Sequence, residues 1–432
     1  MISETDVLVV GSGMGAFHCV EELVKLGKGK TRIANCTGST YMEWPMGAAV
    51  VLADPSKHKS MVAADPAQWA SQKGVEYVHE ALKEVDANGK VATFSSGRKM
   101  SYKSIVIATG SKLPLLLPSG ELSLDERFAE VRAASSAIAS AKTVVLGGAG
   151  TIAVEVAGDL RIKFPDVRIV ILSRKGGILD GSGVSQKTVD LAMERLKEVD
   201  IEVLKGTIAG DGHKEPVLAP GTLSLTDGTS LEYDVYLPCY MQGPNTAFLA
   251  GSGALDAGNR IVANECLQSK SYPELFGVNT TNQPLGGHPV SSRVTAQAKT
   301  CAANALRVVN GESAQPHKDG EAPPALPGPM NIKVGHGVGG YLIWNALDAP
   351  MSVCCCQPCG GGFPFCPPPC CWPCLPGWAT TCGYCCGDAK GEGGARFMLA
   401  AAPMMAAMHG YKGIGKGVGP GGEVAPAVQQ MK

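Results

Sequence analysis

The sequence predicts an α/β fold in which one strand–turn–helix unit occurs twice. The stretch VLVVGSGMGAFHCVEEL occupies residues 7–23, and VVLGGAGTIAVEVAGDL occupies residues 144–160. In each, an apolar strand leads through a glycine-rich turn into a helix with apolar residues on one face. A further strand follows each helix, TRIA in the first copy and RIVILS in the second. This order of elements begins a Rossmann-type, three-layer ββα domain, so we expect two such domains.

Both glycine turns fit the pattern G-x-G-x-x-[GA]. The first glycine permits a tight turn, the second lets the backbone approach a pyrophosphate, and the small third residue lets the helix pack close to the strand. The helix N-terminus adds free N–H groups and partial positive charge. We expect these residues to contact two dinucleotides: Gly11, Gly13, Gly15 and Ala16 in the first turn, and Gly148, Gly150 and Ala153 in the second. Two dinucleotides in one chain indicate electron transfer between them.

Composition is typical of an α/β protein without a polyanionic partner. The chain has 432 residues, 38 of them basic and 39 acidic, so its charge gives no indication of nucleic-acid binding. No apolar run approaches the roughly 20 residues that cross a bilayer. The N-terminal MISETDVLVV lacks the basic region and cleavage site of a signal peptide. We therefore expect a cytoplasmic protein.

The remaining elements follow in order along the chain. Residues 41–57 are expected to form a loop and a short helix, and residues 104–111, SIVIATGS, a buried strand that ends in a small-residue turn. PLLLPSGE is expected to be a crossover linker. A helix over 294–311 ends at Gly311. Tight turns between short strands are expected at Asn88–Gly89, Ser96–Gly97 and Asp227–Gly228.

These motifs together resemble a known superfamily. The order of strand–GxGxxA, IVIATGS, a second strand–GxGxxA with VEVAGDL, and a PNT segment is similar to that of the FAD-dependent pyridine nucleotide-disulfide oxidoreductases over residues 5–312. Within them, the chain resembles the apoptosis-inducing-factor-like and ferroptosis-suppressor-like NAD(P)H:quinone oxidoreductases. The resemblance implies FAD at the first glycine turn, NADH or NADPH at the second, and a quinone acceptor. It also places Ala108, Thr109 and Gly110 near FAD, and Glu155 near the contact between nicotinamide and flavin.

The resemblance also implies a domain order in which an NAD(P)H domain is inserted into a split FAD domain, with a Cys/Pro/Gly-rich C-terminal extension. The expected boundaries are 1–120 and 255–312 for the FAD domain, 121–254 for the NAD(P)H domain, 313–350 for a linker and C-terminal element, 351–388 for a Cys-rich segment and 389–432 for the tail.

Several positions depart from the superfamily pattern. Cys36 stands alone where the disulfide reductases carry a Cys-x4-Cys pair, so we expect it to be a small buried residue. Asn35 replaces the acid that holds the adenosine ribose. Asn279 and Thr280 replace the Gly-Asp that reaches the flavin ribityl chain, and Met241 stands where a glycine is expected. Either the FAD site tolerates these neutral residues, or the chain is a degenerate, non-catalytic scaffold or redox sensor that acts through its Cys-rich tail.

In the second unit, Ser173 and Arg174 stand where an acid would select NADH. A basic residue there favours a 2′-phosphate, which indicates NADPH or both cofactors. The alternative is that Arg174 is a solvated loop arginine. No proton donor to an acceptor is evident; His18 and His288 are the nearest candidates by segment.

The segment between Cys354 and Cys386 holds eleven of the 16 cysteines. It is either low-complexity or membrane-contacting sequence, a metal site, or a disulfide-bonded element. The C-x2-C spacings that could ligate a metal are formed by Cys356, Cys359, Cys371, Cys374, Cys382 and Cys385. Beyond them, FMLAAAPMMAAMHG could form a short apolar helix, interrupted by Pro403, that contacts a membrane peripherally or packs on its own protein.

Overall fold

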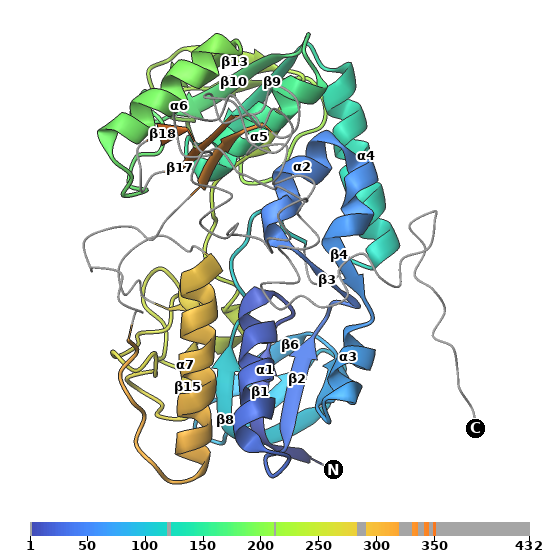
Figure 1. Cartoon of the computed structure of the whole chain (residues 1–432), viewed down its shortest axis with the longest axis vertical. Helices are drawn as coiled ribbons and strands as arrows, with labels where there is room; N and C mark the ends of the chain where they lie inside the picture. Colours follow the sequence, from blue (N-terminus) through green and yellow to red (C-terminus); the bar gives the residue numbers. More distant parts are fainter. Residues whose placement is uncertain are drawn as a thin grey trace, which may run out of the picture.

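A computed structural model describes residues 2–118, 122–210, 213–282, 291–318, 331–335, 341–344 and 349–350. A mixed sheet and a parallel sheet lie at opposite ends of the long axis. Helix α2 (Ala48–Ala53) lies between them, and α4 (Leu124–Ser140) runs from this region up beside the second sheet (Figure 1). The α/β class and the two Rossmann-type units that the sequence predicts are therefore present.

The first sheet has the strand order β5-β2-β1-β8-β7-β6, and β15 pairs with β8 beyond this path. β1, β2, β5, β8 and β15 pair in parallel, whereas β6 and β7 add an antiparallel edge. The turns at Asn88–Gly89 and Ser96–Gly97 connect β6, β7 and β8, as the sequence predicts. The strands are β1 (Ser3–Val10), β2 (Ile33–Thr37), β5 (Glu76–His79), β6 (Leu82–Asp86), β7 (Val91–Phe94), β8 (Lys99–Ile107) and β15 (Leu275–Gly277).

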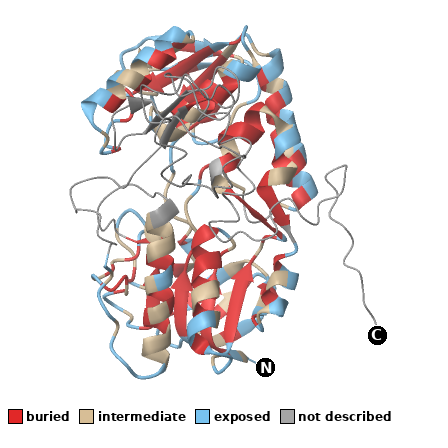
Figure 2. Ribbon diagram, viewed as in Figure 1, coloured by how far each residue is buried: buried red, intermediate tan, exposed pale blue. Residues whose placement is uncertain are grey.

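Helices α1 (Met14–Gly27) and α7 (Ser291–Val309) lie side by side on this sheet (Figure 1). Their buried faces share one apolar core with β1 and β15, in which Val9, Cys19 and Ala302 are fully buried. The apolar strands appear as a continuous buried band in Figure 2. α7 returns to the first sheet after the chain has passed through the second, so residues far apart in sequence complete one unit.

The second sheet is wholly parallel, with the order β11-β10-β9-β14. Helices α5 (Thr151–Lys163) and α6 (Gln186–Glu198) pack on it, and the β12–β13 hairpin turns at Asp227–Gly228 as the sequence predicts. The strands are β9 (Thr143–Gly147), β10 (Arg168–Ser173), β11 (Ile201–Lys205), β12 (Gly221–Ser224), β13 (Ser230–Tyr233) and β14 (Val235–Pro238).

The region between the sheets is richer in structure than the sequence suggests. Residues 41–57 are expected to form a loop and a short helix. The structure adds an antiparallel pair of short strands, β3 and β4, on either side of that helix, and helices α3 (Pro66–Gln72) and α4 were not predicted. α4 begins with a capping box formed by Ser123 and Glu126. The other elements here are β3 (Tyr41–Glu43), η1 (Pro45–Gly47), η2 (Pro55–Met61) and β4 (Val62–Ala64).

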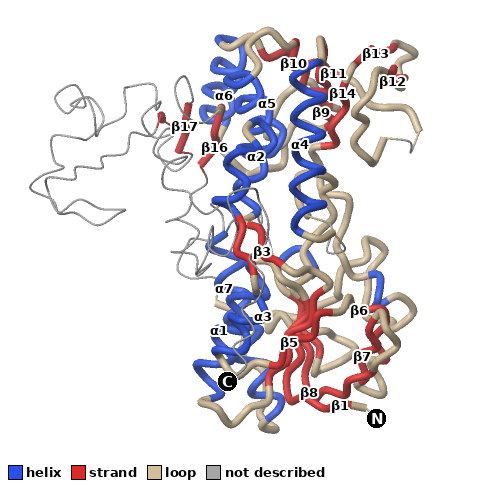
Figure 3. Tube along the Cα trace, turned by 90° about the vertical axis from the view of Figure 1, so that its right-hand side faces the viewer, coloured by secondary structure: helices blue, strands red, loops and turns tan. Residues whose placement is uncertain are grey.

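α2 packs on both α4 and α5, and their relation is clearest in the side view of Figure 3. Ala49 and Leu52 of α2 belong to the same buried cluster as Ile138 of α4 and Leu146 and Val154 of the second unit. A segment that follows the first sheet's second strand thus contributes to the core of the second unit. The two units are joined by packing as well as by the chain.

Near the second unit, β16 (Asn331–Val334), β17 (Tyr341–Trp344) and β18 (Ala349–Pro350) form a small antiparallel sheet beside α5 and α6. Gly158 in α5 permits this approach, because a Cβ placed there would lie 2.7 Å from Val334 Cα. Within the described residues, no helix is both long enough and apolar enough to cross a bilayer.

Candidate functional site

The first glycine turn connects β1 to α1 and brings the backbone of β8 close. Gly11 has φ +124°, and a Cβ at this position would lie 2.6 Å from Ala108 O. A side chain is therefore excluded by both conformation and space. Gly13, the N-cap of α1, has the ordinary values φ −80° and ψ −174°, and a Cβ built there would meet nothing within 4 Å. Gly13 is not required by the protein's own packing.

The second turn reproduces this geometry. Gly148 has φ +97°, and Gly150, the N-cap of α5, has φ −81° and ψ −174°, again with nothing within 4 Å of an ideal Cβ. Ala16 and Ala153, the third small residues, are both buried against their strands. The two copies agree in backbone conformation as well as in sequence.

Neither N-cap has a side-chain acceptor for the first amides of its helix. The free N–H groups and the open space beside Gly13 and Gly150 form a cradle that fits a pyrophosphate. In α1, Gly15 has a second reason to be small, because its Cβ would lie 3.1 Å from Val278 Cγ1. The residues at both turns therefore fit a dinucleotide.

Asn35 lies in the middle of β2, and its side chain is hydrogen-bonded to the first turn. Its Nδ2 donates to Val9 O at 3.1 Å and to Gly11 O at 2.9 Å. A carboxylate in this position could accept hydrogen bonds but could not make these two. The amide oxygen of Asn35 remains as a neutral acceptor for a ribose hydroxyl.

The chain passes between the two units twice, at residues 109–112 and 242–245. These two crossover segments pair with each other. Thr109 Oγ1 donates to Asn245 O at 2.5 Å, and Asn245 Nδ2 donates back to Thr109 O at 3.1 Å. Asn245 N also donates to Gly110 O at 2.9 Å, where Gly110 has φ +67°. The hydroxyl of Thr109, which we expected near FAD, is therefore used to hold the two crossovers together.

Just after β15, the chain carries Asn279 and Thr280 in place of the Gly-Asp pair expected from the superfamily pattern. Asn279 has φ +55°, a left-handed conformation that asparagine tolerates better than most residues, and its N–H donates to Gln297 Oε1 at 2.9 Å. The backbone that glycine would adopt is thus retained. Thr280, in the position of the missing aspartate, offers only a neutral hydroxyl.

The loop after β10 contains the residues expected to recognise the second dinucleotide. Ser173 Oγ donates to Gly177 O at 2.5 Å and accepts from Gly176 N at 3.1 Å, so it shapes the loop. Arg174 is exposed. Lys175, which sequence reasoning missed, adds a second cation here and lies 2.6 Å from Asp180. Glu155 is half-buried on α5.

Comparison with known proteins decides the family. Residues 5–279 match the model of the pyridine nucleotide-disulphide oxidoreductase family. The chain belongs to this family. It is 23% identical over 348 residues to the oxidoreductase ptaL of Pestalotiopsis fici, which covers 77% of this chain and 90% of that protein. It is also 24% identical over 249 residues to the sulfide-quinone reductase of Aquifex aeolicus, a match that covers 51% and 56% of the two chains.

The fold of the family is shared as well. The structure of the Aquifex aeolicus sulfide:quinone oxidoreductase superposes with a TM-score of 0.61 at 16% identity, and covers 79% of this chain and 83% of that one. The cofactors of the family are FAD and NAD(P)H, which confirms the expected cofactors.

This member of a disulphide oxidoreductase family has no thiol pair within the described ranges. Cys19, Cys36, Cys239, Cys266 and Cys301 are all free and buried. Burial raises the pKa of Cys36 to about 12, so its thiol is protonated at neutral pH. The expectation that Cys36 is a small buried residue is confirmed.

The remaining predicted residues lie away from the two glycine turns or outside the described residues, except for the crossover that follows β14. His18 is buried on α1, and Met241 is 45% exposed in the crossover that follows β14. Tyr240, next to Met241, was missed: its ring lies 3.5 Å from where a Cβ of Gly148 would be. His288, the six candidate metal-binding cysteines and the C-terminal apolar segment lie outside the described residues. No set of three His, Cys, Asp or Glu side chains suited to a metal occurs among the residues that are described.

Proposed function

We propose that the chain is an FAD-dependent NAD(P)H oxidoreductase that passes electrons to a quinone-like acceptor. The observation that carries the proposal is the pair of glycine turns, Gly11–Gly13 and Gly148–Gly150, which share a positive φ at the first glycine and nearly identical angles and open space at the N-cap glycine. Packing alone does not require Gly13 or Gly150, whereas a pyrophosphate at each helix would.

We assign FAD to the first unit and NAD(P)H to the second. On this assignment the FAD domain is split, because β15 and α7 return to the first sheet after the chain has formed the second. Gly11, Gly13, Ala16, Asn35 and Thr280 hold FAD. The residues that hold NAD(P)H are Gly148, Gly150, Ala153, Glu155 and Arg174.

The cofactors, when bound, supply the hydride and electron chemistry, and the protein supplies binding, orientation and exclusion of water. The helix N-termini of α1 and α5 neutralise the two pyrophosphates. Asn35 Oδ1 accepts from a ribose hydroxyl while its Nδ2 holds the turn. Arg174 supplies the cation that suits a 2′-phosphate, because Lys175 is paired with Asp180, so NADPH is the preferred donor.

A quinone is proposed as acceptor for two reasons. A relative is named a sulfide-quinone reductase. The chain also lacks, at Cys36, the thiol pair through which disulfide reductases pass electrons, so a bound flavin would reduce its acceptor directly. From the sequence resemblance over residues 5–312 we further propose that the chain is a quinone reductase of the apoptosis-inducing-factor-like type. From the apolar stretch FMLAAAPMMAAMHG we propose that it contacts a membrane peripherally.

The test is spectroscopic. Purified full-length protein should show flavin absorbance that bleaches under anaerobic conditions on addition of NADPH, and more slowly with NADH. A short-chain ubiquinone analogue should then restore the absorbance. Protein that is colourless and cannot be reconstituted with FAD would support the scaffold alternative; bleaching without reoxidation by the quinone would reject the acceptor but keep the reductase.

A further inference from the structure

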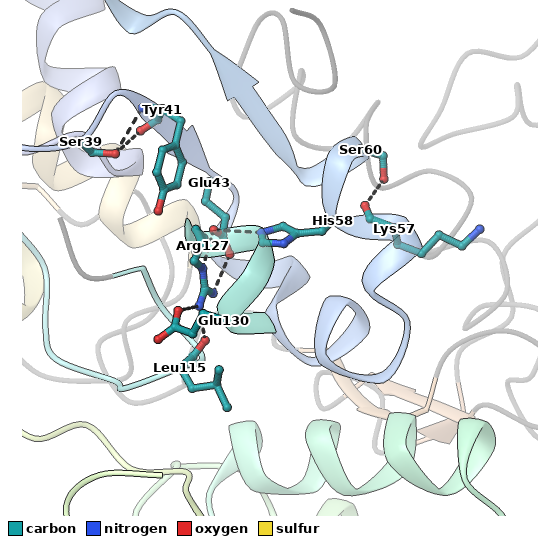
Figure 4. A network of polar contacts seen from close by, with 9 residues as sticks. All are labelled: Ser39, Tyr41, Glu43, Lys57, His58, Ser60, Leu115, Arg127 and Glu130. Carbon is teal, nitrogen blue, oxygen red and sulfur yellow. Dashed lines mark hydrogen bonds and ion pairs between the residues drawn. The ribbon is translucent and has the colours of Figure 1, made fainter. Parts of the chain in front are cut away.

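A buried ionic cluster lies where the segment after β2 meets α4 (Figure 4). Arg127 of α4 is fully buried, and Glu43 of β3 and His58 of η2 have side chains only 2% exposed. Glu130 of α4 and the carbonyl of Leu115 complete it. Charged side chains are seldom buried this deeply unless they are paired.

The pairing is directional. Arg127 Nε donates to Glu43 Oε2 and Nη2 donates to Glu43 Oε1, both at 3.0 Å, which is a bidentate geometry. Arg127 Nη1 donates to Leu115 O at 2.7 Å and to Glu130 Oε2 at 2.6 Å. His58 Nε2 lies 3.1 Å from Glu43 Oε2. We call the bidentate pair the Glu43–Arg127 clamp.

The electrostatics show that the clamp is charged. Burial alone would raise the pKa of Glu43, but His58 and Arg127 outweigh it and lower that pKa to about 2. The two acids likewise raise the pKa of Arg127 above its usual range, against the effect of burial. Both partners are therefore ionised at every pH at which the protein would function.

The residues of the cluster come from three segments of the chain, some of which continue from the first sheet and one of which leads into the second. Glu43 and His58 belong to the segment that follows the first sheet's β2. Leu115 lies just after the crossover that leaves the first sheet, and Arg127 lies on α4, which leads directly into β9 of the second sheet. The clamp thus bridges the two units at a site separate from both glycine turns.

The apolar contact between the units explains their attachment but not their orientation. Hydrophobic burial is non-directional, so the apolar contacts of α2 define the relative orientation of the two units less narrowly than a directional ion pair does. A bidentate arginine–carboxylate pair accepts only a narrow range of angles. We propose that the Glu43–Arg127 clamp fixes the orientation of the second unit on the first and thereby, given the proposed function, the approach of nicotinamide to flavin.

The proposal can be tested without cofactors, by hydrogen exchange at the paired crossovers. The amides of Lys112, Gln242 and Asn245 donate across these crossovers, to Gly243 O, Lys112 O and Gly110 O. In the full-length Arg127→Met variant, their exchange should become at least tenfold faster, while the amides of β1 and β9 exchange at the wild-type rate.

The matched control is Arg168→Met. Arg168 forms a bidentate pair with Glu202 at 2.7 and 2.8 Å, but this pair is exposed and lies within the second unit. Its loss should change exchange at the crossovers by less than twofold. If Arg127→Met does not fold, Glu43→Gln, which keeps size and shape but removes the charge, should accelerate crossover exchange at least threefold.

The outcome that overturns the proposal is crossover exchange at the wild-type rate in a folded clamp variant.

Where FAD and NADPH bind, flavin reduction gives a second readout. In Arg127→Met, flavin reduction by NADPH should slow at least tenfold, while the dissociation constants of both cofactors stay within threefold of wild type. Arg127→Lys should recover part of the rate. If the protein binds neither cofactor, the exchange result still stands, so failure of the clamp and failure of the proposed function are distinguishable.

Discussion

The two glycine N-caps allow binding to be removed without disturbing the fold. At Gly13 and Gly150, φ is near −80° and no atom lies within 4 Å of an ideal Cβ. Valine in either position should therefore lower the stability of the apoprotein by only about 1 kcal/mol, the order of an N-cap change. The same side chain would occupy the space in which a pyrophosphate approaches the backbone.

The effect on binding can be estimated from the hydrogen bonds lost. A hydrogen bond between a backbone amide and a charged phosphate is worth about 1.5–3 kcal/mol, so displacement of one such bond weakens binding by roughly 10- to 150-fold. Gly13→Val should purify without flavin yet bind NADPH, whereas Gly150→Val should retain flavin and lose NADPH. Absorbance spectra and NADPH titration measure both.

The control is the neighbouring first glycine. Gly11→Ala places a Cβ 2.6 Å from Ala108 O at φ +124°, so this variant should lose stability whether or not FAD is present, as thermal unfolding would show. If Gly13→Val kept wild-type flavin affinity, or if the two valine variants exchanged phenotypes, the assignment of the cofactors to the turns would be wrong.

Three further predictions concern single residues. Arg174→Ala should raise KM for NADPH about tenfold and leave that for NADH nearly unchanged; steady-state kinetics with both donors measure the ratio, and an unchanged ratio would mean a solvated arginine. Gly158→Val should clash with the strand at Val334 and destabilise the fold by about 1–3 kcal/mol, which would be measured as a lower melting temperature and faster proteolysis next to Val334. Because the folded pKa of Glu43 is about 2, below the usual 4.5, its charge stabilises the fold above pH 4.5 by up to about 3 kcal/mol, and this is lost as the pH falls towards 2. Denaturant unfolding at several pH values should show a shallower acid dependence for Glu43→Gln than for wild type.

The elements that local sequence determines could be predicted. The first glycine of each turn, Gly11 or Gly148, has a positive φ that favours glycine, so sequence and structure are tied at these two positions. The tight turn at Asp227–Gly228 is determined in the same way, because Gly228 has φ +85°, whereas in the turn at Asn88–Gly89 the positive φ falls on Lys90, at +54°. Asn279, at φ +55°, keeps the conformation of a glycine position although it lacks the acid that usually follows.

Features that depend on distant contacts could not be predicted. The three-residue strands β3 and β4 have no periodic pattern and exist because each pairs with the other. Glu43 and Arg127 are 84 residues apart, and an arginine in sequence normally indicates exposed surface. The one local signal that was available is the capping box at Ser123 and Glu126, which marks the start of α4.

The neutral residues around the first turn do not by themselves imply loss of FAD. A hydrogen bond to a charged acceptor contributes about 1.5–3 kcal/mol and a neutral one about 0.5–1.5, so each replaced acid costs about 1 kcal/mol. Two replacements, at Asn35 and Thr280, therefore weaken binding by roughly 30-fold for a ligand with many other contacts. Against this, Asn35 adds two bonds to Val9 O and Gly11 O that hold the turn in its binding conformation, and no acid could make them. Compared with a site that carries the acids, this site offers less charge to FAD but holds the turn in its binding conformation beforehand. The glycine cradle on which pyrophosphate binding depends is intact.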